Sequence, residues 1–77
     1  MTQFFMHLRH ADDLMKDSEG SMLPDLEAAK EEARASANEL VADQIKHGQV
    51  INDQSFEIWS DGELRATVDF FEAINHP

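Results

Sequence analysis

Alternating apolar and polar side chains mark the beginning of the chain, over residues 3–9. One side of this extended segment carries Phe4, Met6 and Leu8, and the other side carries Phe5, His7 and Arg9. A period of two residues is typical of a β-strand, so the pattern predicts a strand with one strongly apolar face. Polar residues at 10–13 predict a turn, residues 14–17 a short returning strand, and residues 17–20 a second turn.

The longest regular pattern follows Pro24. Residues 26–47 contain no glycine or proline, and their apolar side chains recur at intervals of three and four, which predicts a helix. Asp25 is placed to cap its first turn, and Gly48 to end it. The apolar stripe consists of Leu26, Ala29, Ala33, Ala37, Leu40, Val41 and Ile45. Because alanines form its first half, we expect close helix–sheet contact near Ala29, Ala33 and Ala37.

Two further alternating segments, 55–59 and 64–70, predict a β-hairpin after a connection at 49–54 that carries a turn signal at Asn52-Asp53. A two-residue loop of Asp61 and Gly62 would mix apolar and polar side chains on each face. A three-residue loop at 60–62 pairs Ile58 with Leu64, Glu57 with Arg65 and Phe56 with Ala66, which keeps the apolar side chains together. We therefore predict the three-residue loop, and a short helical turn within 71–77.

These elements predict an α+β fold in a single domain, residues 1–77. One long helix packs on one face of an antiparallel sheet of three or four strands, in the order β-β-α-β-β. The number of strands depends on whether residues 11–17 pair as a strand.

The charge balance narrows the possible partners. The chain has six Lys and Arg residues and sixteen Asp and Glu residues, which gives a formal net charge of -10. Binding to nucleic acid or to an anionic membrane surface requires clustered basic residues, so neither partner is expected. The chain has no cysteine, which excludes disulfides and thiol chemistry. No apolar run approaches a membrane span and no signal peptide is visible, so we expect a cytoplasmic protein.

Candidate catalytic and metal-binding residues are few. His10, Asp12 and Asp13 could weakly hold a divalent cation, although solvated turn residues explain the same pattern. Asp43 and His47 are spaced for pairing at the helix end. Carboxylate pairs are frequent in so acidic a chain, and a small domain offers little room for a pocket that shifts a pKa. We therefore expect no enzymatic activity, no cofactor and no metal site.

The more informative feature is the sheet face that a single helix leaves uncovered. Phe5, His7, Trp59 and Phe71 are expected to face away from the helix, with Arg65 among the polar residues around them. Exposed aromatic and arginine side chains favour a protein-interaction site. Shielding of Phe5 and Trp59 by long side chains or by the tail is the alternative. Exposed edge strands could also pair between two copies and produce a homodimer.

Several motifs resemble known families. Phe4-Phe5-Met6-His7-Leu8-Arg9, Glu19-Gly20, Leu23-Pro24-Asp25-Leu26-Glu27-Ala28-Ala29 and Phe56-Glu57-Ile58…Asp61-Gly62 together resemble a family of small proteins of unknown function that is abundant in rhizobia and other alphaproteobacteria. That resemblance implies a bacterial cytosolic origin and no established activity. Residues 12–50 are also similar to the core of HicB-type antitoxins, which implies an acidic protein that neutralises a small basic toxin.

The function therefore stays unknown at the level of the sequence. The residues favour a small acidic protein-interaction or regulatory module that is not an enzyme and that binds a protein partner or itself. The alternative is an antitoxin-like partner of a small basic protein.

Overall fold

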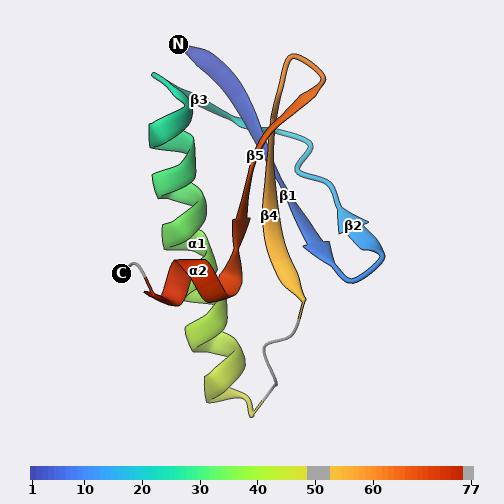
Figure 1. The fold of residues 1–77 in the computed structure, drawn as a ribbon, viewed down its shortest axis with the longest axis vertical. Helices are drawn as coiled ribbons and strands as arrows, with labels where there is room; N and C mark the ends of the chain where they lie inside the picture. Colours follow the sequence, from blue (N-terminus) through green and yellow to red (C-terminus); the bar gives the residue numbers. More distant parts are fainter. Residues whose placement is uncertain (49–52, 76–77) are drawn as a thin grey trace.

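In the computed structural model, which describes residues 1–48 and 53–75, a five-stranded antiparallel sheet lies against one long helix (Figure 1). The elements are β1 (Thr2–His10), β2 (Asp13–Met15), β3 (Ser21–Leu23), α1 (Leu26–Lys46), β4 (Gln54–Ser60), β5 (Glu63–Asp69) and α2 (Phe70–Asn75). The predicted α+β class, with one long helix on the sheet, is confirmed. Most of the predicted connection at 49–54, including Asn52 of its turn signal, lies outside the described residues.

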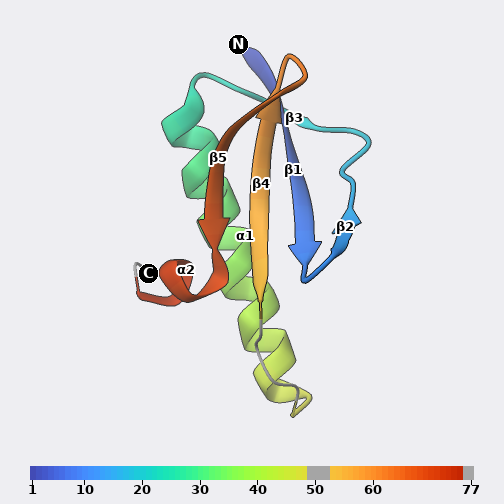
Figure 2. The same cartoon turned by 45° about the vertical axis from the view of Figure 1, so that its right-hand side comes forward.

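Strand β1 is the strand on which the sheet is built. Strand β4 pairs along one side of β1 and carries β5 on its own far side, as Figure 2 shows. The other side of β1 is shared, because β2 pairs with residues 8–10 and β3 pairs with residues 2–4. Residues 11–17 thus contain a strand, and β3 adds a further one that the sequence did not predict. Three residues are too few to establish a period of two.

Helix α1 begins and ends where its capping residues predict. The Asp25 side chain accepts a hydrogen bond from the Ala28 backbone N–H, with Oδ1 and N 2.9 Å apart. His47 is the C-cap residue, and Gly48 follows with a φ of 72°, in the left-handed region that favours glycine. The imidazole of His47 also lies 3.6 Å from the Asp43 carboxylate, the pairing expected from their spacing.

The alanine stripe of α1 lies in the core. Ala29, Ala33 and Ala37 are fully buried, which confirms that this face of the helix is covered closely. Leu40 and Ile45, predicted to belong to the same stripe, are instead exposed. The lower end of α1 extends past the sheet (Figure 2). Within its last two turns Val41 is still buried, and Gln44 Nε2 donates a hydrogen bond to Gln54 Oε1 of β4 at 2.9 Å.

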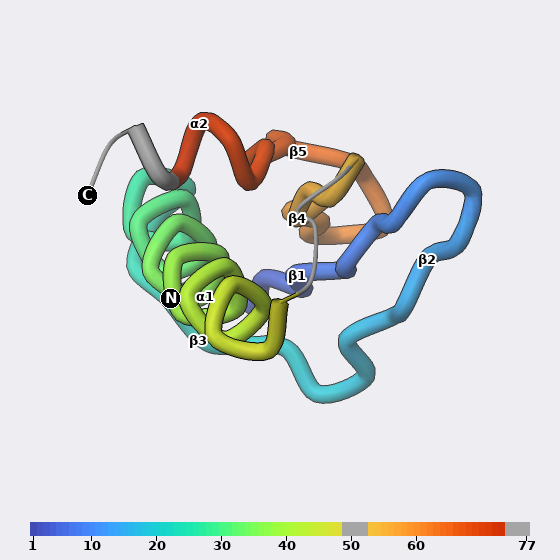
Figure 3. The backbone as a smooth tube through the Cα atoms, turned by 90° about the horizontal axis from the view of Figure 1, so that it is seen from below, coloured from blue at the N-terminus to red at the C-terminus, as the bar shows by residue number. Residues whose placement is uncertain are grey.

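The chain turns into α2 directly after β5, one residue earlier than predicted. The Asp69 carboxylate accepts a hydrogen bond from the Phe71 N–H at 2.8 Å and so stabilises the first turn. Phe70 and Ala73 of this short helix are buried, and the Phe70 ring packs 5.4 Å from that of Phe56. Seen end on, α2 lies beside α1 and extends the helical layer next to β5 (Figure 3).

The β4–β5 hairpin differs from the predicted register. Its loop has two residues, Asp61 and Gly62, both with positive φ (53° and 74°), as a type I′ turn requires. The three-residue loop is therefore wrong, and so is the predicted pairing of Glu57 with Arg65. A β-bulge leaves Arg65 without a partner on β4 and shifts the register by one residue, so that Ile58 lies opposite Ala66.

Because the bulge shifts the register by one residue, the two-residue loop is compatible with the hydrophobic pattern of both strands. Beyond it, the apolar side chains of β4 and β5 again share the helix-facing side, and Phe56 lies opposite Val68. Before the bulge, Leu64 lies opposite Trp59 and turns to the other side of the sheet, where half of its surface is exposed. The expectation that Leu64 faces the helix is thus wrong.

We expect Gly20→Ala to lower the free energy of unfolding by about 2 kcal/mol, because two penalties combine. Gly20 has a φ of 72°, and a Cβ at this position would lie 3.0 Å from the Phe4 carbonyl oxygen. Gly62→Ala is the matched control, since Gly62 has the same φ sign but open space around it. Urea denaturation followed by Trp59 fluorescence measures both. Equal losses for the two variants would contradict the close approach at Gly20.

Candidate functional site

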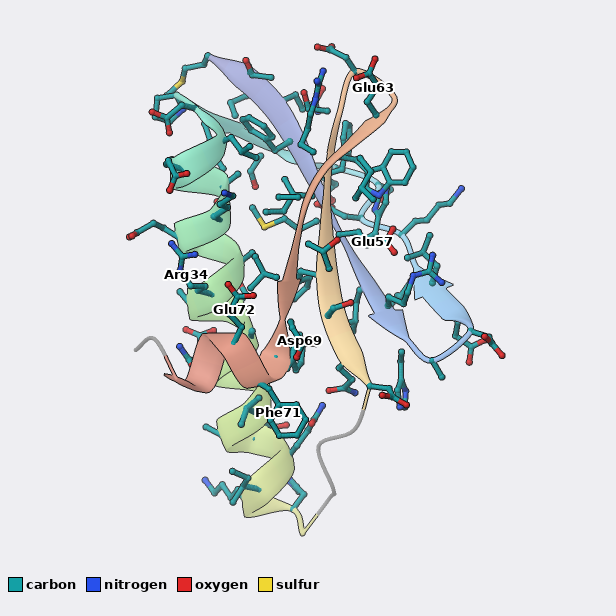
Figure 4. The ribbon with its side chains drawn as sticks, viewed as in Figure 1. Arg34, Glu57, Glu63, Asp69, Phe71 and Glu72 are labelled. Carbon is teal, nitrogen blue, oxygen red and sulfur yellow. The ribbon has the colours of Figure 1, made fainter. Side chains whose placement is uncertain are left out.

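The face of the sheet that turns away from α1, which we call the outer face, is built by alternate residues of three strands. Its members are Phe5, His7 and Arg9 of β1, Ser55, Glu57 and Trp59 of β4, and Leu64 and Thr67 of β5. Across the strands, Phe5, Trp59 and Leu64 form an apolar row, and His7, Glu57 and Thr67 form a polar row beside it. Figure 4 shows Glu57 on the side of the sheet away from α1.

Three rings lie next to one another on this face. The His7 imidazole is 6.3 Å from the Phe5 ring and 6.0 Å from the Trp59 ring, measured between centroids. All three side chains are half-buried. At such centroid distances the rings attract one another. Because each side chain is only half-buried, part of its surface stays accessible to solvent.

Glu57 is a charged side chain with only 8 % of its surface exposed. Its carboxylate accepts hydrogen bonds from Arg9 Nε and, at 3.1 Å, from Trp59 Nε1. The hydrogen bond from Arg9 lowers the pKa of Glu57, and the bond from Trp59 adds to this effect against the opposing effect of burial. The ionised carboxylate therefore fixes the orientation of the Trp59 indole on the outer face.

The connection between β2 and β3, residues 16–20, passes along the outer face, and we call it the strap. Its Asp17 carboxylate accepts hydrogen bonds from the backbone N–H groups of Met6, Glu19 and Gly20, each at 3.2 Å. The Asp17 N–H in turn donates to His7 Nδ1 at 3.0 Å. Asp17 thereby satisfies the Met6 N–H in the gap between β2 and β3, where β1 has no strand beside it.

The same contacts determine the charge state of Asp17. Burial alone would raise its pKa, but the hydrogen bonds from Gly20, Met6 and Glu19 hold the pKa below its usual value of 3.8. Near neutral pH a negative charge therefore sits beside the aromatic rings.

Between the strap and the outer face lies an open depression with a volume of about 330 Å³. Its lining consists of Phe5, His7, Lys16, Asp17, Ser18, Trp59 and Gly62. This volume lies at the lower end of the range for small-molecule pockets, and the site is open rather than enclosed. It is suited to a single side chain presented by another molecule.

The predicted interaction residues separate into two groups. Phe5, His7 and Trp59 come together at the depression. Arg65 does not join them, because its guanidinium lies 3.2 Å from Glu63 and 3.8 Å from Asp61 at the hairpin. Phe71 is exposed but lies on α2, on the helical side of the sheet (Figure 4), so its expected place on the outer face is wrong.

Leu64 and Asp17 are among the members of the site that were not predicted. Leu64 was assigned to the helix-facing side because the bulge was not foreseen. Asp17 was assigned to the end of a short strand and the start of a turn, and not to the site, although an aspartate followed three residues later by a glycine is a pattern typical of side-chain bonding to a local backbone turn. The strap could have been suspected from that signal, but its contact with His7 could not.

The proposed cation ligands lie at the β1–β2 turn, where His10 and Asp13 are opposite each other. Within residues 1–48 and 53–75, no group of three or more histidine, aspartate or glutamate side chains is arranged to hold a metal ion. Nor does either helix in this part of the chain have the length and apolar character needed to span a bilayer.

Acid is expected to weaken the fold partly through Asp17 and Glu57. Both have a folded-state pKa below the usual values of 3.8 and 4.5, so their contribution is complete above about pH 4.5 and is lost as the pH falls through the folded values. The measurement is the urea midpoint of Glu57→Gln and of the wild type between neutral pH and about pH 3. We expect a smaller loss in the variant. If the urea midpoint of Glu57→Gln fell with pH as steeply as that of the wild type, Glu57 would contribute nothing to the acid dependence.

Comparison with known proteins gives one match. A family model described as a domain of unknown function, DUF6894, matches residues 3–71, which include α1, the outer face and all the strands except the first residue of β1. No curated protein and no solved structure matches the chain.

Proposed function

The chain belongs to the DUF6894 family, a domain of unknown function, and we propose that it acts as a small, non-enzymatic protein-binding module. In this proposal the outer face of the sheet is the contact surface. The supporting observation is the apolar row of Phe5, Trp59 and Leu64, which lies on the side of the sheet opposite α1. Aromatic side chains on a half-exposed surface with a polar surround are typical of protein-binding sites.

The geometry favours contact through this face over pairing through a strand edge. Strand β5 forms one edge of the sheet, but the bulge at Arg65 interrupts it, and Glu63 and Asp69 place charges along it. Bulges and charges are features by which proteins prevent edge-to-edge pairing. The opposite edge is divided between two strands of three residues each, with the strap between them. Neither edge offers a long, flat row of free backbone groups.

Charge favours a different protein over a second copy of this chain. Each copy carries a net charge of -10, so two copies repel each other. A partner with a basic surface is attracted by the same field, which raises the rate of encounter. The partner we propose is therefore a basic protein, and self-association is the weaker version of the proposal.

The test is affinity capture from the native host with three forms of the protein: wild type, Trp59→Leu and Phe71→Ala. The last is a matched control, because Phe71 is an exposed aromatic residue outside the outer face. We expect a basic protein that is captured by the wild type and by Phe71→Ala but is lost with Trp59→Leu. Capture of the same protein by all three forms would contradict the proposed contact surface. Light scattering after size exclusion reports any homodimer.

The antitoxin-like alternative shares the requirement for a basic partner and is favoured by the same net charge. It adds the prediction that the partner is a small toxic protein encoded beside this chain. Co-expression of such a neighbour, with growth as the measurement, separates the two functions. Growth arrest that this chain relieves would support neutralisation, whereas a harmless neighbour would count against it.

A further inference from the structure

We propose that the depression beside the strap binds one cationic side chain, an arginine or a lysine, of the basic partner. This inference rests on the proposed function and gives the chemical character of its central contact. It concerns the site formed by Phe5, His7, Asp17 and Trp59.

The rings supply the first part of the argument. A cation held within about 6 Å of an aromatic centroid is attracted to the negative face of the ring, most strongly in the case of tryptophan. Phe5, His7 and Trp59 all line the depression, and successive centroids are 6.3 and 6.0 Å apart. One planar guanidinium or one ammonium group placed between them can therefore contact more than one ring.

The hydrogen bonding of His7 is compatible with a bound cation. Its Nδ1 accepts the hydrogen bond from the Asp17 N–H, and a nitrogen that accepts a hydrogen bond carries no proton. In this arrangement His7 faces the strap with an acceptor nitrogen.

The carboxylates supply the second part. Asp17 is part of the lining, and its hydrogen bonds keep it ionised. Glu57 lies on the same face, but its nearly buried carboxylate is already paired with Arg9 and holds the Trp59 indole. An aliphatic side chain would use the rings but gain nothing from the Asp17 charge, whereas an arginine or lysine side chain uses both.

Lys16 provides a specific test of the inference, because its positively charged side chain lines the depression. Its side chain is exposed, and no carboxylate of the described residues lies within ion-pair distance of its ammonium group. A partner cation must displace Lys16 or share the site with it. Removal of the Lys16 charge should therefore strengthen the binding of a cation and leave the binding of an uncharged side chain unchanged.

The experiment titrates isotope-labelled protein with three capped tripeptides: Ac-Gly-Arg-Gly-NH₂, its citrulline analogue, which is nearly isosteric but neutral, and its leucine analogue. The readouts are the indole N–H signal of Trp59, the single tryptophan of the chain, and the backbone amide of His7. We expect saturable shifts with the arginine peptide and at least about fivefold weaker binding of the other two. Lys16→Gln should tighten arginine binding about twofold.

Two variants separate this site from general attraction to an acidic protein. Trp59→Leu should abolish the saturable shift at His7, and Phe71→Ala should leave the affinity for the arginine peptide unchanged. Binding of the leucine peptide as tightly as the arginine peptide would overturn the cationic contact while leaving the protein-binding face supported. Shifts with the arginine peptide that survive Trp59→Leu, or an absence of saturation with every peptide, would also overturn it. The capture experiment decides the proposed function independently of these results.

Discussion

Phe70→Ala is expected to lower the free energy of unfolding by about 3–5 kcal/mol, the usual loss for a buried phenylalanine. Phe70 is 1 % exposed, and its ring packs against Phe56 of β4. A domain of this length has a total stability of about 4–12 kcal/mol, so the variant would lose a large fraction of it. Chemical denaturation of the wild type and the variant, followed by circular dichroism, measures the loss.

The adjacent residue provides the control. Phe71 belongs to the same short helix and is 57 % exposed, so Phe71→Ala is expected to change the stability by no more than about 0.5 kcal/mol. The contrast tests whether α2 is part of the core. Similar, small losses for both variants would mean that α2 does not hold Phe70 against the sheet in solution.

Ala33→Leu is expected to destabilise the protein by about 3 kcal/mol, because the larger side chain has no space in the core. Ala33 is completely buried in the middle of the alanine stripe of α1. A leucine at this position must push α1 away from its neighbours or adopt a strained rotamer. The result is measured as a fall in the urea midpoint without a change in slope.

Ala35→Leu is the matched control for this substitution. Ala35 lies on the exposed side of the same helix, where leucine has nearly the same helix propensity as alanine. Its expected effect on the free energy of unfolding is below about 0.5 kcal/mol. A stable Ala33→Leu variant would show that the helix and the sheet can separate without loss, and that the alanines do not determine their distance.

Much of the fold was predictable because its signals are local. Asp25 and Gly48 mark the ends of α1 through backbone geometry that involves only neighbouring residues. The period of two in β1 and β4 places Phe5 and Trp59 on the side opposite Ile58 without knowledge of the fold. These two rings were therefore assigned correctly to one face of the sheet.

Predictions that depended on an assumed regular ladder were less successful. The hairpin pattern was read under the assumption that every residue of β5 has a partner on β4, which favoured the three-residue loop. Because of the bulge, Arg65 has no partner on β4, so that assumption does not hold and the two-residue turn of Asp61 and Gly62 is possible. One inserted residue reverses the face of every residue on its far side, so the error moved Leu64 to the wrong side of the sheet.

The sequence alone thus determined the long helix, the alternation of the main strands and the acidic character of the chain, because each follows from residues near one another or from composition. Only the tertiary structure decided that residues 16–20 pass beside His7, that Glu57 pairs with Arg9 and that Phe71 lies on the helical side of the sheet. These contacts join residues that are distant in the chain, and several of them depend on the twist and the bulge of the sheet. No periodic pattern encodes such distances, and for that reason the depression on the outer face could be described only from the folded protein.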